Sequence, residues 1–297
     1  MKNILITGGT GLIGSELQKL LNEKGYETAI LTRSKKSDGS RTFFWDYEKG
    51  IIDDEALLFA DAIIHLAGEN ISAGRWTPEQ KKRILDSRVR TTQLLVEKIR
   101  TSAKKPEVFI SASAVGYYGS GLSNKVFHED DLPGKDFLAE TTVQWEQTSF
   151  PLEAMGVRRF VLRTGVVLSE KGGALPKMMA PVKMGFGTAL GSGKQMMSWI
   201  SLTDLVRLYV FVLEHSGLRS VYNAAAPTPL DNKTFMKLLA RFAHRPFFLP
   251  AVPGFVMKAM YGEMSSILLE GQAVSADKIT AAGFDFRHKT LKDYLNL

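Results

Sequence analysis

Short apolar runs alternate with segments whose apolar residues recur every three or four positions. The runs are typical of strands and occur at Ile4–Ile6, Glu27–Thr32, Thr42–Trp45, Asp61–Leu66, Val108–Ala112, Arg159–Arg163 and Ser220–Asn223. The helical spacing covers residues 12–21, 78–100, 137–154 and 204–213. Strands that alternate with helices predict a parallel sheet with right-handed crossovers. We therefore expect an α/β fold, a Rossmann-like doubly wound sheet.

The alternation weakens after Leu168. Residues 171–194 are rich in glycine and methionine with little regular pattern, and Pro246, Pro250 and Pro253 precede short helical stretches. We expect a dinucleotide-binding domain over residues 1–245, whose segment 168–200 faces the substrate or covers the cofactor. A small helical extension is expected over residues 246–297.

Composition excludes several classes of function. The chain of 297 residues has a formal charge of +7, no cysteine, and five histidines without metal-ligand spacing, so we expect no metal site. The basic residues are scattered, which argues against nucleic-acid binding. No apolar run approaches the ~20 residues of a membrane helix, and Met1 to Asn3 lead straight into the first strand. We expect a cytoplasmic protein without membrane contact.

A glycine-rich turn, Thr7–Gly14, follows the first strand and opens the first helix. Glycine lets the backbone approach a pyrophosphate closely, and the free amides at the helix start point at its oxygens. This context favours a dinucleotide site over a ligand-free turn. We expect the phosphate contacts from Gly8, Thr10, Gly11, Leu12, Ile13 and Gly14.

The end of the second strand bears on the choice of cofactor. An acidic residue there binds the ribose 2′-hydroxyl of NAD, whereas an arginine suits the 2′-phosphate of NADP. The sequence reads Thr32-Arg33-Ser34-Lys35-Lys36, with no acid. It favours NADP over the alternative of a solvated basic turn, because a guanidinium makes bidentate bonds to phosphate.

Two further strand ends supply candidate chemistry. Small residues at Leu66-Ala67-Gly68 let the backbone pass close to the cofactor, and Glu69 is either a general acid or base or simply a loop acid. Ser111 and Ser113 end the fifth strand, followed by Tyr117 and Tyr118. A serine there can bind a substrate carbonyl and a tyrosine can donate a proton. Packing is the alternative role for the tyrosines.

These residues resemble the short-chain dehydrogenase/reductase superfamily, in its extended NAD(P)-dependent epimerase/dehydratase branch. The similar motifs are Thr7–Gly14, His65–Gly68, Ser113–Gly119, Arg163–Leu168, and Trp199-Ile200 with Asp204.

More narrowly, the chain resembles uncharacterised "epimerase family" proteins, sometimes labelled cell-division-inhibitor-like, including their C-terminal extension. The matching pieces are Leu66–Ile71, Gly74–Thr77, Ser87–Val89, Gly262-Glu263 and Leu268–Gln272. The resemblance implies an NADP-binding Rossmann fold with cofactor contacts from Thr32, Arg33, Leu66, Ala67, Arg88 and the backbone at Val167.

One departure from the superfamily concerns catalysis. Its enzymes use a Tyr-x-x-x-Lys pair on the helix after the fifth strand, but residues 137–146 here contain neither tyrosine nor lysine. Ser113, Tyr117, Tyr118 and Glu69 are the available candidates to replace the pair.

Two functions therefore stay open. One is an NADP(H)-dependent oxidoreductase or epimerase-like enzyme acting on a small-molecule substrate. The other is a non-catalytic NADP(H)-binding redox sensor or regulatory module. A homodimer is a possible assembly.

Overall fold

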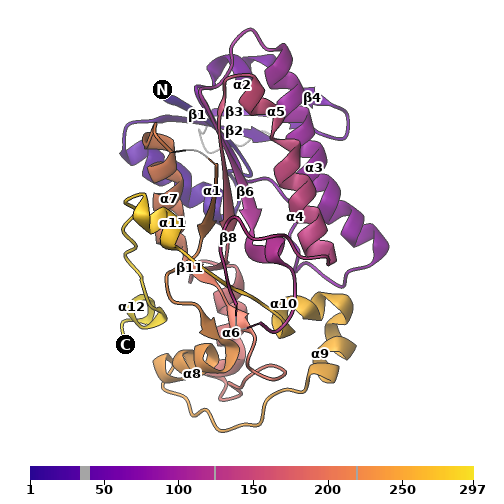
Figure 1. The fold of residues 1–297 in the computed structure, drawn as a ribbon, viewed down its shortest axis with the longest axis vertical. Coiled ribbons are helices and arrows are strands. Elements are labelled where there is room, and N and C mark those ends of the chain that lie inside the picture. The colour runs from indigo at the N-terminus through magenta and orange to yellow at the C-terminus, as the bar shows by residue number, and fades with distance from the viewer. Residues whose placement is uncertain (34–40, 124, 219) are drawn as a thin grey trace.

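A computed structural model describes residues 1–33, 41–123, 125–218 and 220–297 (Figure 1). Its centre is an eight-stranded sheet of order β12-β8-β6-β5-β1-β2-β3-β4, parallel except for the β3–β4 pair. The strands are β1 (Asn3–Thr7), β2 (Glu27–Thr32), β3 (Arg41–Asp46), β4 (Ile51–Ile52), β5 (Ala62–His65), β6 (Val108–Ala114), β8 (Arg158–Thr164) and β12 (Ser220–Ala224).

The strand order reverses at β1. Strands β2 and β3 extend the sheet on one side, whereas β5, β6, β8 and β12 extend it on the other. Such a reversal leaves a crevice beyond the carboxyl ends of the two central strands, here β1 and β5. The predicted doubly wound Rossmann-like sheet is confirmed.

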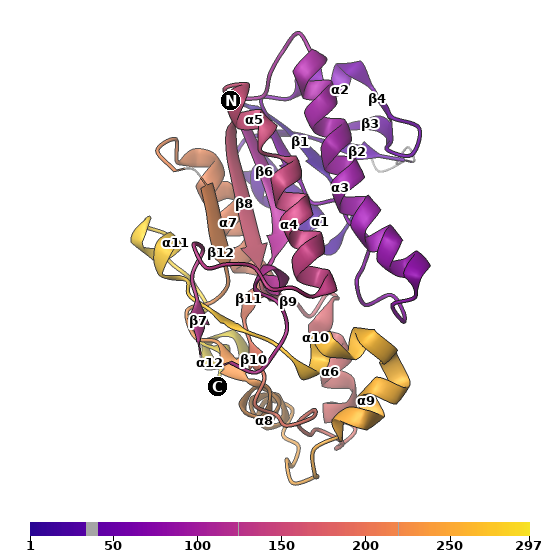
Figure 2. The same ribbon diagram turned by 45° about the vertical axis from the view of Figure 1, so that its right-hand side comes forward.

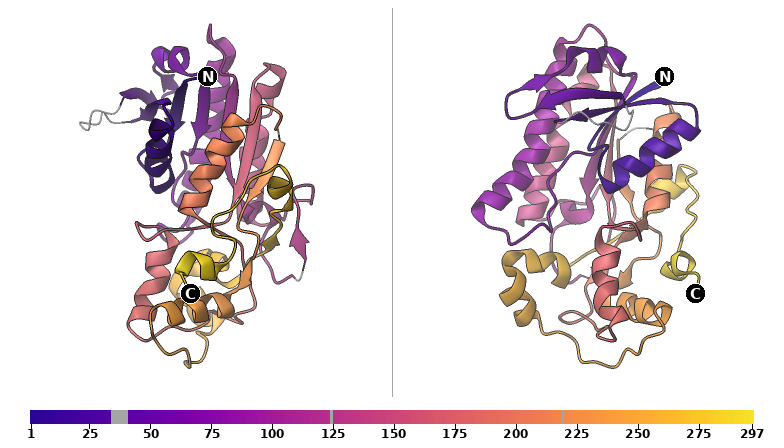
Figure 3. Two further views of the ribbon diagram at one scale, coloured as in Figure 1. Left: turned by 90° about the vertical axis from the view of Figure 1, so that its left-hand side faces the viewer. Right: turned by 180° about the vertical axis from the view of Figure 1, so that it is seen from behind.

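Helices cover both faces of the sheet (Figure 3). Side chains of β1 alternate, so Ile4 and Ile6 pack with α1 (Leu12–Glu23) and α7 (Leu202–Glu214), and Leu5 packs on the opposite face. That second face carries α2 (Asp54–Phe59), α3 (Pro78–Thr101), α4 (Phe137–Thr148) and α5 (Pro151–Ala154). The helices therefore cover the two faces of the sheet and not the carboxyl ends of its strands.

Two predicted elements need correction. The helix expected over residues 137–154 is two helices, because Pro151 has no backbone N–H to continue α4 and instead begins α5. The segment 171–194, expected to lack regular pattern, contains α6 (Ala174–Lys183). Its buried Leu175, Met179 and Val182 have helical spacing, which the surrounding glycines and prolines obscured.

Beyond the carboxyl ends of the sheet lies a second lobe (Figure 2). Helix α6, helix α8 (Asn232–Phe242) and helix α12 (Leu291–Leu295) share one core with Trp199. Three short strand pairs complete it: β9 (Val166–Leu168) with β11 (Trp199–Ser201), β10 (Met196–Met197) with β13 (Leu230–Asp231), and β7 (Val126–Phe127) with β14 (Ala273–Val274).

The last fifty residues form α9 (Gly254–Tyr261), the 3-10 helix η2 (Gly262–Ser265), α10 (Ser266–Leu269), β14, α11 (Asp277–Ala281) and α12. They pack at several places on the body: β14 pairs with β7, α11 contacts β12, and α12 contacts α8. The domain division at residue 245 stays a prediction. Within the described part of the chain, no helix is long and apolar enough to cross a membrane.

Candidate cofactor-binding and catalytic site

The glycine loop joins β1 to α1 at the crevice. Gly8 has φ +67°, and a Cβ there would lie 2.9 Å from the Leu66 carbonyl. A Cβ on Gly14 would lie 2.4 Å from the Gly8 oxygen, so only glycine lets the first turn of α1 lie against the loop. Gly11 is the N-cap of α1 and makes no side-chain cap bond. The loop therefore forms a backbone cradle at an uncapped helix start, which fits a pyrophosphate.

A buried hydrogen-bond chain fixes β5 beside this loop. Thr7 Oγ1 accepts from the backbone N–H groups of Leu66 and Ala67, both at 3.1 Å, and lies 2.7 Å from His65 Nδ1. His65 Nε2 lies 3.0 Å from Thr92 Oγ1, whose own proton goes to the Arg88 carbonyl. The network therefore places the ring proton on Nε2. Burial, with a smaller effect of Arg88, lowers the pKa of His65 to about 3, so it is neutral.

Arg88 on α3 lies directly beside the predicted loop Leu66–Gly68. A Cβ on Gly68 would lie 3.2 Å from the Arg88 Cζ. The guanidinium donates to the carbonyls of Ile84 and Glu69, each at 3.0 Å, and makes no ion pair among the described residues. Burial lowers the pKa of Arg88 to about 10, against the Glu69 charge, which raises it. Its other contacts are also neutral, the Ser87 hydroxyl at 3.5 Å and the Trp145 ring at 5.3 Å, so this cation suits an anionic or hydroxyl-bearing ligand.

The predicted apolar cofactor contacts come together on one side of the crevice. Leu12, Ile13, Leu66 and Val167 are partly buried and pack against the same core cluster. The segment after β9 returns to this place, since a Cβ on Gly173 would lie 3.3 Å from Leu12. Thr10, on the loop itself, is exposed. The structure thus assembles these residues from the start of α1, the end of β5 and β9.

At the end of β2, Thr32 is half-buried and Arg33 is exposed. The residues that follow, Ser34 and the basic Lys35 and Lys36, lie outside the described residues. Burial raises the pKa of Tyr47, after β3, and the charges of Arg33 and Arg90 lower it. Arg90 also lies 5.9 Å from the centre of the Tyr47 ring. Sequence reasoning missed Arg90, whose approach to this strand end depends on the packing of α3.

The candidates Ser113 and Tyr118 belong to a buried polar network. Arg163 on β8 donates to both oxygens of Glu146 on α4, each at 2.9 Å. Ser113 Oγ donates to the same carboxylate at 2.6 Å. Tyr118 Oη accepts from Arg163 at 3.0 Å and donates to Asn223 Oδ1 at 2.8 Å. Both hydroxyls, expected to serve a substrate, are occupied within the protein.

Electrostatics strengthen this network. Burial opposes the charge on Arg163, but the Glu146 carboxylate more than offsets it and raises the Arg163 pKa above its usual range. Burial raises the pKa of Tyr118 to about 12, with Arg163 lowering it in part. Tyr118 is therefore a weaker acid than an exposed tyrosine. Glu146 was missed from the sequence because its partner lies on another element.

Tyr117 and Glu69 are placed differently. Both side chains are half-buried, and no hydrogen bond holds either side chain among the described residues. The Arg163 Cζ lies 3.3 Å from the centre of the Tyr117 ring. Tyr117 lies in the 3-10 helix η1 (Val115–Tyr118), which directly follows β6.

Helix α4 packs against η1 without the usual acid–base pair. A Cβ on Gly116 would lie 3.4 Å from Leu138 and 4.0 Å from Thr142 Oγ1. These two residues have the four-residue spacing of a Tyr-x-x-x-Lys pair, but neither can move a proton as that pair does. Across the described ranges, no cluster of His, Asp and Glu has the arrangement of a metal site.

The doubly wound sheet, the glycine cradle and the serine–tyrosine segment after β6 define a Rossmann-fold protein of the short-chain dehydrogenase/reductase type. The chain belongs to the NAD dependent epimerase/dehydratase family, which residues 4–225 match. Residues 252–296 match a C-terminal domain of unknown function, DUF1731. The resemblance seen in the sequence is confirmed.

Individual proteins agree with this assignment. Epimerase family protein YfhF of Bacillus subtilis is 38% identical, over 98% of this chain and 95% of its own. The crystal structure of human epimerase family protein SDR39U1, solved with NADPH, superposes with a TM-score of 0.89 at 33% identity, covering 99% of this chain and 97% of that one. A Thermus thermophilus UDP-glucose 4-epimerase solved with NAD superposes with a TM-score of 0.78 at 19% identity, over 99% and 97%, which supports the fold alone.

Proposed function

We propose that the protein is an NADPH-dependent reductase of a carbonyl group in a small molecule, with Tyr117 as the proton donor. The position of Tyr117 carries the proposal. Of the two tyrosines after β6, Tyr118 is buried and hydrogen-bonded, whereas the half-buried Tyr117 hydroxyl has no partner among the described residues. It follows directly on β6, the neighbour of β5, whose carboxyl end borders the crevice.

Several features support NADPH as the cofactor. The cradle of Gly8, Gly11 and Gly14 suits the pyrophosphate, and Arg33, without an acid beside it, suits a 2′-phosphate. The human relative was solved with NADPH. When bound, NADPH supplies a hydride to the carbonyl carbon.

The chain's own residues supply the proton and its electrostatic setting. Tyr117 holds a proton at Oη that passes to the carbonyl oxygen, which leaves a phenolate. The Arg163 guanidinium over the ring stabilises that negative charge, as a cation does over an aromatic face. Glu146 and Tyr118 are positioning residues in this scheme because they bond Arg163, and Ser113 is one because it bonds Glu146. Reduction, which consumes a proton, suits a tyrosine acid better than the reverse reaction.

A panel of carbonyl compounds with NADPH tests the proposal. Tyr117→Phe should lower kcat by about 10²–10⁴-fold, the usual contribution of general acid catalysis, and leave NADPH affinity unchanged. Leu122→Ala, an exposed change nearby, is the control. Full activity of Tyr117→Phe on a substrate that the wild type reduces would refute this role.

The second candidate function is a non-catalytic NADP(H) sensor. It is favoured by Leu138 and Thr142, which occupy the four-residue spacing on α4 where an acid–base pair would face η1. Tight NADPH binding without turnover of any compound in a broad panel would support the sensor and count against the reductase.

A further inference from the structure

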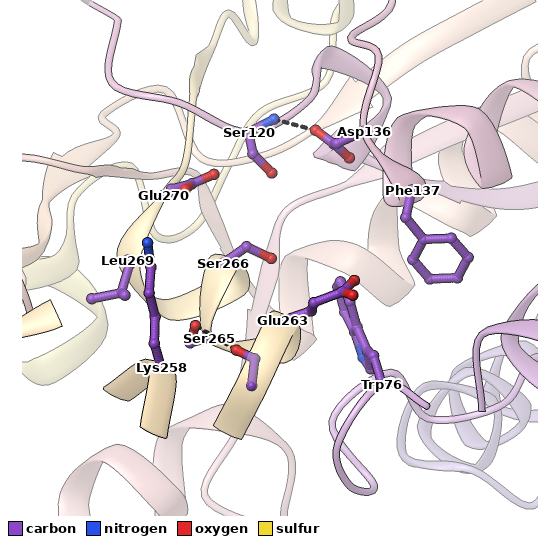
Figure 4. A pocket seen from close by; sticks show the side chains of 11 residues that line it. Trp76, Ser120, Asp136, Phe137, Lys258, Glu263, Ser265, Ser266, Leu269 and Glu270 are labelled. Carbon is purple, nitrogen blue, oxygen red and sulfur yellow. Dashed lines mark hydrogen bonds between the residues drawn. The ribbon is translucent and has the colours of Figure 1, made fainter. Parts of the chain in front are cut away.

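A cavity of about 480 Å³ lies between the Rossmann part and the C-terminal extension (Figure 4). Trp76, Ser120, Asp136 and Phe137 line it from the Rossmann part. The extension contributes Lys258, Gly262, Glu263, Ser265, Ser266, Leu269 and Glu270. Ser120, one of the lining residues, follows Tyr117 by three positions in the sequence. Its volume is that of a site for a small molecule.

One wall of the cavity is aromatic. Trp76 and Phe137 pack edge to face with ring centres 5.3 Å apart, and Figure 4 shows both on the same side of the cavity. The Trp76 Nε1 proton is already donated to the Ile71 carbonyl at 2.8 Å. The wall therefore offers apolar ring surface, against which the C–H groups of a ligand can pack.

The polar lining is rich in hydrogen-bond acceptors. Asp136 caps α4 by accepting from Leu138 and Ala139 at one oxygen, and its other oxygen accepts from the Ser120 N–H, so its carboxylate is fixed in place. Glu263 pairs with Lys81, which lies outside the lining. Glu270 makes no ion pair among the described residues, and Lys258 is the one cation among the lining residues. Three carboxylates thus face the space with two ammonium groups nearby.

We propose that this cavity binds a small, uncharged polyhydroxy carbonyl compound and discriminates against phosphorylated ligands. The inference that the ligand carries a carbonyl group rests on the proposed reductase function. The inference that it is uncharged rests on the lining of the cavity alone. Ionised carboxylates only accept hydrogen bonds, so they need a ligand that donates, as hydroxyl groups do. A phosphate or diphosphate would lie among like charges without an arginine to bind it.

Lys258 is the specific donor for the ligand in this arrangement. Its ammonium group can donate to a carbonyl or hydroxyl oxygen, and Ser120 and Ser266 can both donate and accept. The aromatic wall then covers the apolar face of the same molecule.

The test uses the full chain labelled with 5-fluorotryptophan and saturated with NADP⁺, so no reduction can occur. Trp76→Phe identifies the Trp76 signal among the four tryptophans. D-erythrose, D-erythrose 4-phosphate and UDP-glucose are titrated as probes. We expect D-erythrose to shift the Trp76 ¹⁹F resonance at about tenfold lower concentration than either phosphorylated probe.

Charge-reversal variants assign the preference to the cavity. Glu270→Lys should abolish the discrimination against D-erythrose 4-phosphate, and Glu270→Gln should reduce it. Glu23→Lys, an equal charge change at an exposed position on α1, should leave it intact. Equal or tighter binding of a phosphorylated probe to the wild type, or no Trp76 response to any probe, would overturn the proposal. Because the readout needs no turnover, an inactive protein would refute the reductase function alone.

Discussion

Arg163 and Glu146 form a bidentate ion pair, with Nε and Nη2 each 2.9 Å from a carboxylate oxygen, and both side chains are over nine-tenths buried. The pair joins β8 to α4 beneath η1. Because the guanidinium also lies over Tyr117, the place of the proposed proton donor depends on the buried Glu146 carboxylate.

Glu146→Gln should destabilise the protein by about 3–5 kcal/mol, because it leaves the buried Arg163 without its counter-charge. Urea unfolding followed by circular dichroism measures this loss. Glu97→Gln, an exposed change on α3, should stay within about 0.5 kcal/mol of the wild type. Equal stabilities of the two variants would show that the pair contributes little.

Arg33→Ala should weaken NADPH binding by about 1.5–3 kcal/mol, the usual value of a charged hydrogen bond, and leave NADH binding unchanged. Isothermal titration calorimetry with both cofactors measures the difference, and NADH is the internal control. If the wild type binds NADH and NADPH equally well, the cofactor assignment is wrong.

Substitutions of two glycines of the loop should have different effects on NADPH binding and on stability. A Cβ on Gly11 meets only the Gly8 oxygen, at 3.3 Å, so Gly11→Val should abolish NADPH binding and leave most of the fold. A Cβ on Gly14 would lie 2.4 Å from that oxygen, so Gly14→Ala should lower the melting temperature as well. Calorimetry and thermal unfolding separate the two effects. Undiminished NADPH affinity of Gly11→Val would contradict the phosphate cradle.

His65 should make stability depend on pH. Its pKa in the folded protein is about 3, below the ordinary value of 6.5, so the unfolded chain binds the proton first as pH falls. The contribution of neutral His65 to the free energy of unfolding is fully present above pH ~6.5. Below that pH it should be lost at about 1.4 kcal/mol per pH unit. Below pH ~4, carboxylates such as Asp61, whose pKa is lowered to about 2, add to the slope.

Urea unfolding between pH 4 and 6.5, compared with His65→Asn, measures this dependence. The variant should be less stable at pH 7 and show a flatter profile over this range. An unchanged slope would mean that His65 is protonated in the folded protein.

The sequence was sufficient for the sheet and the glycine loop because both depend on local patterns. Apolar runs marked the long strands, and Gly8 to Gly14 directly followed one of them. Helix α6 was missed since Pro176 and Pro181 interrupt a pattern that packing nevertheless satisfies. Pro151 marks the break between α4 and α5 in the sequence. The apolar residues keep a helical spacing on both sides of it, however, and that spacing predicted one continuous helix.

The candidate site was only partly predictable for a different reason. Residues on the loops of β1 and β5 come together through the parallel topology, which the strand–helix alternation implies. Glu146, Arg90 and the cavity lining lie on elements whose mutual packing no local pattern encodes. Ser113 and Tyr118 were correctly placed at the strand end, but their partners across the fold occupy their hydroxyls.

The pairing of β14 with β7 has a consequence for the order in which the molecule matures. Val126 and Phe127 leave the ribosome well before Ala273 and Val274, so this strand pair forms only after the whole chain between them has been made. The residues of the extension that line the cavity, from Lys258 to Glu270, are likewise made after the glycine loop and after Trp76 and Phe137 of the opposite wall. A chain that stops before β14 would lose this strand pair and also Ile279, Phe284 and Phe286, which belong to the core that packs on β1.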